Sequence, residues 1–304
     1  MEFVDYLQAV TDGVMQGAYY ALIGIGFTLI FGVMNKINLA YAAAAFGGAY
    51  ASLGVAALIG AGDDFGLPPL LMFLVSAIAA GLFAWVVYTI CFRFTPDHYE
   101  LATLMATVGA FFLIEEIAVH ATDGEPMDFP EVLQGIIDDP MIEFSDAFAV
   151  RGDLLTIFLL ALIAMGLLLT LLYRTKLGLA TRAVAQQRTA AQLCGISVDR
   201  TNATTFIIAG VLGGLAGAMI GAAVGVLSPL LFVPLTVKGL IVTVMGGLGS
   251  IPGAIVAGLL VGGLENVFLA LRGITERDMY VMLLLFLFLA FRPQGLFGKK
   301  VLRD

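Results

Sequence analysis

The sequence has few charged residues. Only 12% of its 304 positions are Asp, Glu, Lys or Arg, whereas 60% are hydrophobic, and a soluble domain carries about a quarter charged residues. The charges leave long gaps, and most of these reach the roughly 20 apolar residues that a membrane-spanning helix needs. The composition therefore excludes a soluble globular protein and indicates an all-α polytopic membrane protein. The uncharged runs are Gly13–Asn35, Ile37–Gly62, Phe65–Phe92, Leu101–Ile114, Leu154–Tyr173, Thr201–Val237, Gly239–Leu264 and Met279–Phe291.

Cysteine and an N-terminal basic segment are also scarce. Cys91 and Cys194 are the only two cysteines, and two distant cysteines in a membrane chain do not make a disulfide framework, so we expect free thiols. The start, Met1-Glu-Phe-Val-Asp-Tyr6, is acidic and lacks the basic region of a cleaved signal peptide. We therefore expect the first span to remain in the mature protein.

Sequence patterns of catalysis are missing. No GxxxxGK[ST] phosphate-binding loop occurs, and no nucleophile–base pair stands out, so we expect no enzyme activity and no cofactor in this chain. His120 follows Glu116 by one helical turn, but no further metal ligand has a suitable spacing, so we expect a surface histidine and no metal site. Glu115 and Glu116 are interpreted as a solvated helix end, with a proton relay as the alternative.

The remaining charges are unevenly distributed and predict an orientation. The segment 122–152 carries many acidic residues and one base, whereas 174–201 and the C-terminal tail are rich in Lys and Arg. By the positive-inside rule the two basic segments are cytoplasmic, and the acidic loop 122–152 is outside. Because Lys and Arg are absent before Lys36, we expect an external N-terminus and a cytoplasmic C-terminus.

Counting crossings against this orientation predicts about nine spans, within a range of eight to ten, in one domain over residues 1–304. The region 231–253 is the least regular and could instead be a re-entrant segment. The expected helices are 13–35, 39–60, 68–92, 101–120, 153–173, 203–227, 231–248, 252–271 and 278–292.

Glycine is abundant and concentrated in two places. In 239–258 glycine and proline interrupt an apolar stretch, which is typical of the broken helices of transporters. In 210–225 the pairs 210/214, 213/217, 217/221 and 221/225 repeat a GxxxG spacing, which places the glycines on nearly one helix face and lets another backbone approach. We expect a packing role there, inside the bundle or between subunits. The expected hinge residues of the first stretch are Gly246, Gly247, Gly249, Pro252 and Gly253.

The basic segment 174–201 predicts two short helices. Thr181 can cap a helix over Arg182–Gln187, and a second helix over Thr189–Cys194 would end at Gly195, a natural left-handed stop. Ser197 can cap the next span through its side chain. Such a surface suits a soluble partner, and an ordinary basic loop near anionic headgroups is the alternative.

Five stretches stand out for their motifs: Tyr20–Gly32, Ile37–Ala40, Ala190–Arg200, Met245–Gly262 and Phe291–Gly298. Together they resemble LivH-type permeases, the membrane subunits of ABC importers for branched-chain amino acids and related amides. The similarity runs from about residue 13 to the C-terminus. It implies an ABC importer permease fold in the bacterial inner membrane, with a periplasmic N-terminus.

The resemblance implies a transport complex. Its expected partners are a second related permease forming a heterodimer, two cytoplasmic ATPases that bind ATP and Mg²⁺, a periplasmic binding protein and membrane lipid, but no nucleic acid. The alternative is an ion-coupled secondary transporter or channel, which we expect to show an internal repeat and paired central charges. The expected ATPase-coupling residues are Arg182, Arg188, Ala190, Ala191, Gly195, Asp199 and Arg200.

One motif departs from the family. Where the family reads Asn-Phe-Ala-His-Gly, this chain has Asn38-Leu-Ala-Tyr-Ala42, which leaves the substrate open and admits a more apolar or aromatic solute. A contact between Lys238 and Glu265 is conceivable, and a structural ion pair is the alternative to a role in transport. The expected translocation-path residues are Asn38, Tyr41, Lys238, Glu265 and Asn266.

Overall fold

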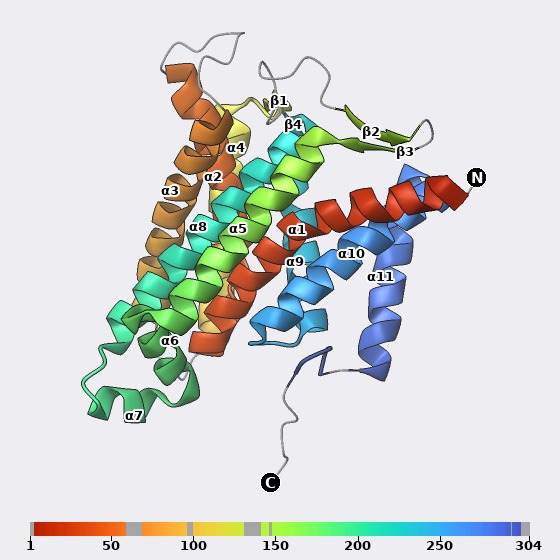
Figure 1. Ribbon diagram of the computed structural model, residues 1–304. Helices are drawn as coiled ribbons and strands as arrows, with labels where there is room; N and C mark the ends of the chain where they lie inside the picture. The colour runs from red at the N-terminus through yellow and green to blue at the C-terminus, as the bar shows by residue number, and fades with distance from the viewer. Residues whose placement is uncertain are drawn as a thin grey trace.

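The computed structural model describes residues 3–58, 69–95, 100–130, 141–145, 148–292 and 294–298. Within these ranges the chain folds as one helical bundle with two small pairs of strands (Figure 1). Its helices are α1 (Phe3–Met34), α2 (Ala40–Leu58), α3 (Pro69–Val87), η1 (Tyr88–Arg93), α4 (Glu100–Ala121), α5 (Gly152–Arg174), α6 (Lys176–Gln186), α7 (Arg188–Leu193), α8 (Val198–Val224), η2 (Pro229–Leu231), α9 (Phe232–Gly246), α10 (Ile251–Arg272) and α11 (Ile274–Phe291). The strands are β1 (Met127–Asp128), β2 (Met141–Ser145), β3 (Phe148–Arg151) and β4 (Val226–Leu227).

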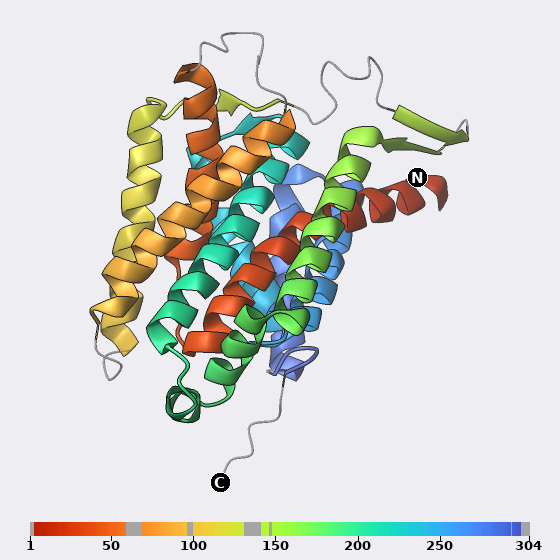
Figure 2. The ribbon, with the colours of Figure 1, turned by 60° about the vertical axis from the view of Figure 1, so that its left-hand side comes forward.

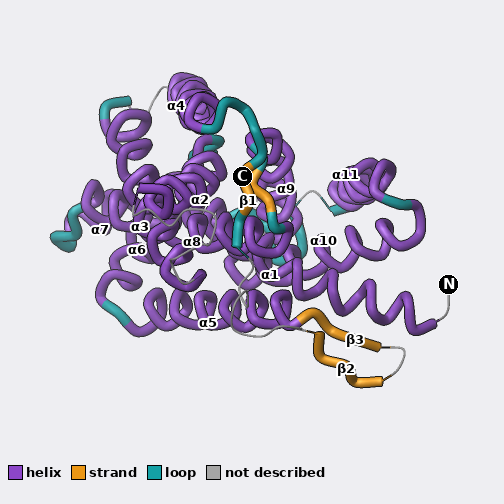
Figure 3. The backbone as a smooth tube through the Cα atoms, turned by 90° about the horizontal axis from the view of Figure 1, so that it is seen from above, coloured by secondary structure: helices purple, strands orange, loops and turns teal. Residues whose placement is uncertain are grey.

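The two ends of the bundle differ. Helices α6 and α7 lie at one end, here named the α7 end, and all four strands lie at the other, the strand end (Figures 1 and 2). Seen along the bundle, α4, α5 and α11 stand at the periphery around α1, α2, α8 and α9 (Figure 3). The central helices are apolar on all sides because they are surrounded by other helices, which explains why their sequences show no polar face.

The spans agree with the sequence. Eight helices of the described residues are long and apolar enough to cross a membrane, and α11 adds the shorter apolar stretch Met279–Phe291. The all-α polytopic class is therefore confirmed. The first helix starts at Phe3 rather than at residue 13, because single charged residues near a helix end do not stop it.

The uncertain region 231–253 contains a crossing. β4, which directly precedes η2, pairs with β1 at the strand end, whereas the glycine that follows α9, Gly249, lies against Gly32 near the far end of α1. Pro229–Gly246 forms one apolar segment of 18 residues between these points. This is the geometry of a crossing rather than of a re-entrant loop.

The glycines of α8 do not share one face, contrary to the prediction. Gly210 and Gly214 face α3, where an added Cβ would lie 2.5 Å from the Cβ of Ala84 and close to the carbonyl of Ser76. Gly213 and Gly217 face α2, where an added Cβ would meet Tyr41 and Ala45. The 100° step between successive residues turns the two GxxxG series onto neighbouring faces. Both faces pack inside the bundle.

The acidic segment 122–152 contains strands that the sequence analysis missed. β1 pairs antiparallel with β4, and β2 pairs antiparallel with β3. Residues 131–140 and 146–147 of this predicted loop lie outside the described part of the chain. The position of the segment at the strand end, opposite α7, matches the predicted separation of acidic and basic loops (Figure 1).

Candidate functional site

The α7 end collects most of the predicted functional residues, and α6 begins it. The side chain of Thr175 accepts a hydrogen bond from the backbone N–H of Gly178, 3.2 Å away, and so caps α6. The prediction that Thr181 caps this helix is wrong, because Thr181 lies inside it and donates to the carbonyl of Leu177 at 3.0 Å. Thr175 starts the helix one and a half turns earlier and leaves Thr181 no free amide to cap.

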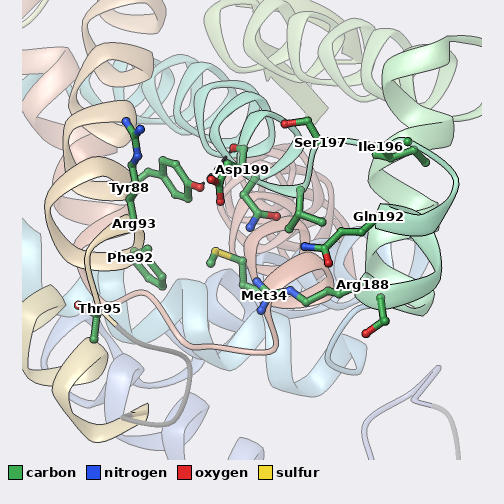
Figure 4. A pocket seen from close by; sticks show the side chains of 14 residues that line it. Met34, Tyr88, Phe92, Arg93, Thr95, Arg188, Gln192, Ile196, Ser197 and Asp199 are labelled. Carbon is green, nitrogen blue, oxygen red and sulfur yellow. Dashed lines mark hydrogen bonds between the residues drawn. The ribbon is translucent and has the colours of Figure 1, made fainter.

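Helix α7 ends as predicted. Gly195 follows it with φ +82°, the left-handed conformation of a helix stop, and Ile196 donates its N–H to the carbonyl of Ala191 at 3.0 Å. Ser197 precedes α8 as predicted, but its side chain makes no capping bond. It lines the neighbouring pocket instead (Figure 4).

The predicted coupling residues lie along α6, α7 and the start of α8 (Figure 1). On α7, Ala190 is exposed whereas Ala191 is buried against the bundle. The guanidinium of Arg182 stacks over the ring of Tyr173, 5.2 Å from its centre. Apart from Ala191, the predicted coupling residues are exposed or half-buried, and they comprise small residues, three arginines and one aspartate. The complete set is Arg182, Arg188, Ala190, Ala191, Gly195, Asp199 and Arg200.

The glycine–proline stretch forms a sharp break between α9 and α10. Gly247 and Gly249 have φ of +99° and +82°, which side chains rarely adopt. Ser250 then caps α10 by accepting from the N–H of Gly253 at 3.3 Å. A Cβ on Gly246 would lie 2.5 Å from the carbonyl carbon of Gly253. All five predicted hinge residues, Pro252 included, therefore belong to this break and to the first turn after it.

A C-terminal strap, residues 294–298, folds back over this break. Leu296 donates its N–H to the carbonyl of Met245 at 2.8 Å, and Phe297 donates to Gly246 at 3.1 Å. These bonds satisfy carbonyls that the end of α9 would leave without partners. The sequence analysis quoted both stretches but missed that they meet. Their shared richness in glycine was the available signal, because close backbone approach requires it.

The break and α6 border a common cavity of about 890 Å³. It is lined by the end of α1, by Thr181 and Arg182 of α6, by Gly249–Pro252 and by the strap. The predicted coupling segment and the predicted hinge thus lie at the same end of the bundle, on either side of one space.

Three predicted path residues form a buried polar cluster inside the bundle. Nζ of Lys238 on α9 lies 2.7 Å from Oε1 of Glu265 on α10, and 3.5 Å from the hydroxyl of Tyr20 on α1. Asn266 donates to Oε1 of Gln16 at 3.0 Å. The predicted Lys238–Glu265 contact is confirmed. Together with the Tyr20 hydroxyl, this contact links α9, α10 and α1.

The other two path candidates bond to backbone groups of the protein. Oδ1 of Asn38 accepts from the N–H of Ala40 at 3.1 Å and caps α2. Tyr41 is 1% exposed, and its hydroxyl donates to the carbonyl of Ala209 on α8 at 3.1 Å. The hydroxyl packs against Gly26 and Gly213, where a Cβ would overlap it.

No group of three or more His, Cys, Asp or Glu among the described residues could hold a metal ion. His120 and Glu116 form an exposed pair at 3.1 Å, as expected of a surface histidine. Cys91 and Cys194 are free thiols, as predicted.

Known proteins resemble this chain over nearly its full length. Residues 9–291 match the family model described as the permease component of branched-chain amino acid transport systems. The high-affinity branched-chain amino acid transport permease LivH of Escherichia coli K12 is 29% identical over 98% of this chain and 97% of its own. BraD of Pseudomonas aeruginosa, described in the same words, is 29% identical with the same coverage. A solved structure of a metal-chelate type ABC transporter in an inward-facing conformation covers 94% of this chain and 85% of its own, at 18% identity and a TM-score of 0.48.

Proposed function

Because this chain belongs to the family of permease components of branched-chain amino acid transport systems, we propose that it forms the translocation path of an ATP-driven importer. The solute we propose is a branched-chain amino acid or a related small organic molecule. Movement would follow alternating access, in which the path opens to one side of the membrane at a time. This proposal rests on the surface of α6 and α7 at the same end as the α9–α10 break.

The energy for this movement comes from separate ATPase subunits. The sequence has no phosphate-binding loop, so ATP and Mg²⁺ would bind on two partner subunits. Their contact would be α7, whose exposed face carries small side chains such as Ala190. Since α6 and the break border one cavity, a shift of α6 would change the shape of the cavity beside Gly249–Pro252.

The orientation that we propose follows from the basic residues. The α7 end would face the cytoplasm and the strand end the periplasm of a bacterial inner membrane. The N-terminus would be periplasmic and the C-terminus cytoplasmic. A periplasmic binding protein would deliver solute at the strand end, and a second related permease would complete a heterodimer.

The buried polar residues are better explained by packing than by solute contact. Lys238 and Glu265 neutralise each other, and Tyr41 and Asn38 bond to backbone groups. We therefore assign Lys238, Glu265 and Asn266 to holding α1, α9 and α10 together. The replacement of the family's histidine by Tyr41 then concerns the contact between α2 and α8, and gives no reason to propose an unusual solute.

The test is reconstitution with the proposed partners in proteoliposomes. Leucine uptake should require ATP, both ATPases and the binding protein. Deleting Ala190–Gly195 should abolish co-purification of the ATPases while the chain remains membrane-inserted. A chain shortened after Gly298 serves as the control, because it keeps α7. Retained ATPase binding by the deletion variant would refute the coupling role, and uptake driven by an ion gradient alone would favour a secondary transporter.

A further inference from the structure

Leu193, at the C-terminal end of α7, is an apolar side chain that lies almost entirely in the open. It is 85% exposed. In the described part of the chain, the other large apolar side chains above 80% exposure are Leu58, Leu230 and Phe291. Those three lie at the ends of apolar helices, where lipid can cover them, whereas α7 is no part of a span. Leu193 was absent from the coupling residues predicted from the sequence.

The protein holds this leucine in a fixed place. Helix α7 protrudes beyond the ends of α1 and α5 (Figures 1 and 2). On its inner side Ala191 is buried, and the carbonyl of Ala191 accepts from the N–H of Ile196 at 3.0 Å. Gly195, with φ +82°, closes the turn that follows Leu193. Because the turn is already formed, little freedom is lost when a partner covers the leucine, which favours binding.

A membrane surface does not suit α7. A helix that lies on a bilayer needs a broad apolar face, whereas the exposed neighbours of Leu193 on α7 are Thr189, Ala190 and Gln192. A single apolar side chain among small and polar ones fits instead into a recess of a protein, where a closely packed pocket removes it from water. The surface around Leu193 is therefore that of a protein contact.

The charges along this segment indicate the chemistry of the partner. Residues 174–201 include five basic residues and one acidic residue, Asp199. Arg188 begins α7 and is half-buried, and Arg200 in the first turn of α8 is exposed. Because opposite charges attract across an interface and like charges repel, a protein that covers Leu193 should present carboxylates around its recess.

We propose that Leu193 is the anchor by which this chain binds its ATPase. Its side chain enters an apolar recess on that subunit, and carboxylates at the rim of the recess face Arg188 and Arg200. The assignment rests on the proposed function and adds to it the chemistry of the contact. The two parts of this contact act on different rates, because charges at the rim steer the approach, whereas a buried anchor holds the complex together.

The first experiment measures the rates of ATPase binding to the full chain in lipid nanodiscs by surface plasmon resonance. Leu193→Ala should raise the dissociation rate about tenfold or more, since most of the apolar contact is lost, and should leave the association rate unchanged. Leu193→Met keeps the volume and should dissociate nearly as slowly as wild type. Arg200→Glu should instead lower the association rate, and this difference should shrink at high salt because ions screen exposed charges.

A matched control separates the anchor from exposure in general. Leu230 is 84% exposed but follows β4 at the strand end, so Leu230→Ala should leave both rates unchanged. Leu193→Ala should unfold at the same temperature as wild type, because the side chain packs little against the bundle. A dissociation rate of Leu193→Ala equal to that of wild type overturns the proposal.

Cys194, the next residue, reports on the same surface without any substitution. Its thiol is exposed, whereas that of Cys91 is buried. A charged, water-soluble maleimide should modify Cys194 rapidly in nanodiscs, and several-fold more slowly once the ATPases are bound. Slow modification before the ATPases are added would place this surface in the bilayer and overturn the proposal.

The outcomes distinguish failure of the anchor from failure of the proposed function. If wild type binds no ATPase, the proposed function fails and the anchor fails with it. If wild type binds the ATPases, the Ala190–Gly195 deletion does not, and Leu193→Ala behaves as wild type, the proposed function stands and the anchor is wrong. Loss of binding in the deletion together with faster dissociation of Leu193→Ala supports both.

Discussion

Nζ of Lys238 lies 2.7 Å from Oε1 of Glu265, and the two side chains are 7% and 3% exposed. The lysine comes from α9 and the glutamate from α10, on opposite sides of the break at Gly246–Gly253. A charge in this position is tolerated only with a partner, because its transfer out of water costs several kcal/mol. The pair therefore fixes how the two helices pack on each side of the proposed hinge.

Removing one member of this pair should destabilise the protein strongly. Lys238→Met or Glu265→Gln each leaves a buried group without its partner, which costs about 3–5 kcal/mol where a charge remains. The double variant Lys238→Met/Glu265→Leu should recover most of this loss, because no charge stays buried. Thermal unfolding in detergent measures the stability of each variant and so ranks the single and double variants. Glu116→Gln, in the exposed pair with His120, is the control and should change stability by less than about 1 kcal/mol. Equal losses in the single and double variants would contradict the structural role.

Two C-terminal truncations should distinguish the contribution of the strap to stability from that of the residues after it. A chain ending at Arg292 loses the two bonds from Leu296 and Phe297 to the end of α9, at about 0.5–1.5 kcal/mol each. A chain ending at Gly298 keeps both bonds and should unfold at nearly the same temperature as the full chain. Hydrogen exchange at Gly247 and Ser250, whose N–H groups bond locally at the break, should rise only in the shorter chain. If both truncations behave alike, the strap does not stabilise the break.

The effects of substitutions at Tyr41 and Gly26 on stability should not be additive. A Cβ at Gly26 would overlap the Tyr41 ring and hydroxyl, so Gly26→Ala should cost about 1–3 kcal/mol by overpacking. Tyr41→Ala should cost about 3–5 kcal/mol by leaving a cavity. In the double variant the added methyl meets no ring, so the total loss should be smaller than the sum of the two. Additive losses in thermal unfolding would show that the two residues do not contact each other. Tyr41→Phe removes only the bond to Ala209 and should cost about 1 kcal/mol.

Gly195 should tolerate substitution only by residues that accept its backbone conformation. Its φ of +82° costs roughly 1–2 kcal/mol for alanine, although a Cβ there would meet nothing within 4 Å. Gly195→Asn should cost less, because asparagine enters this region more readily. Gly109→Ala is the matched control, since that glycine is helical and equally unobstructed, and it should be neutral or stabilising by about 1 kcal/mol. Similar unfolding temperatures for Gly195→Ala and Gly109→Ala would contradict this account.

The predictions that succeeded depend on local chemistry. The stop at Gly195 and the break at 246–253 follow from backbone preferences of glycine and proline, which act over a few residues. The spans follow from the length of apolar runs. The cap at Thr181 failed because Thr175 offered an earlier start, and two competing caps one and a half turns apart cannot be ranked from sequence. The prediction that the α8 glycines share one face was wrong, because the sequence does not show that α2 packs on one side of α8 and α3 on another.

The sequence by itself determined that the chain is a polytopic helical membrane protein, where its helices break, and which family it resembles. These conclusions need only hydropathy, local backbone preference and motifs. The tertiary structure decided which distant groups meet: Lys238 with Glu265, Tyr41 with Ala209, and the strap with the end of α9. In an apolar bundle many pairings bury similar areas, so the pairs are chosen by close packing and by the need of each buried polar group for a partner.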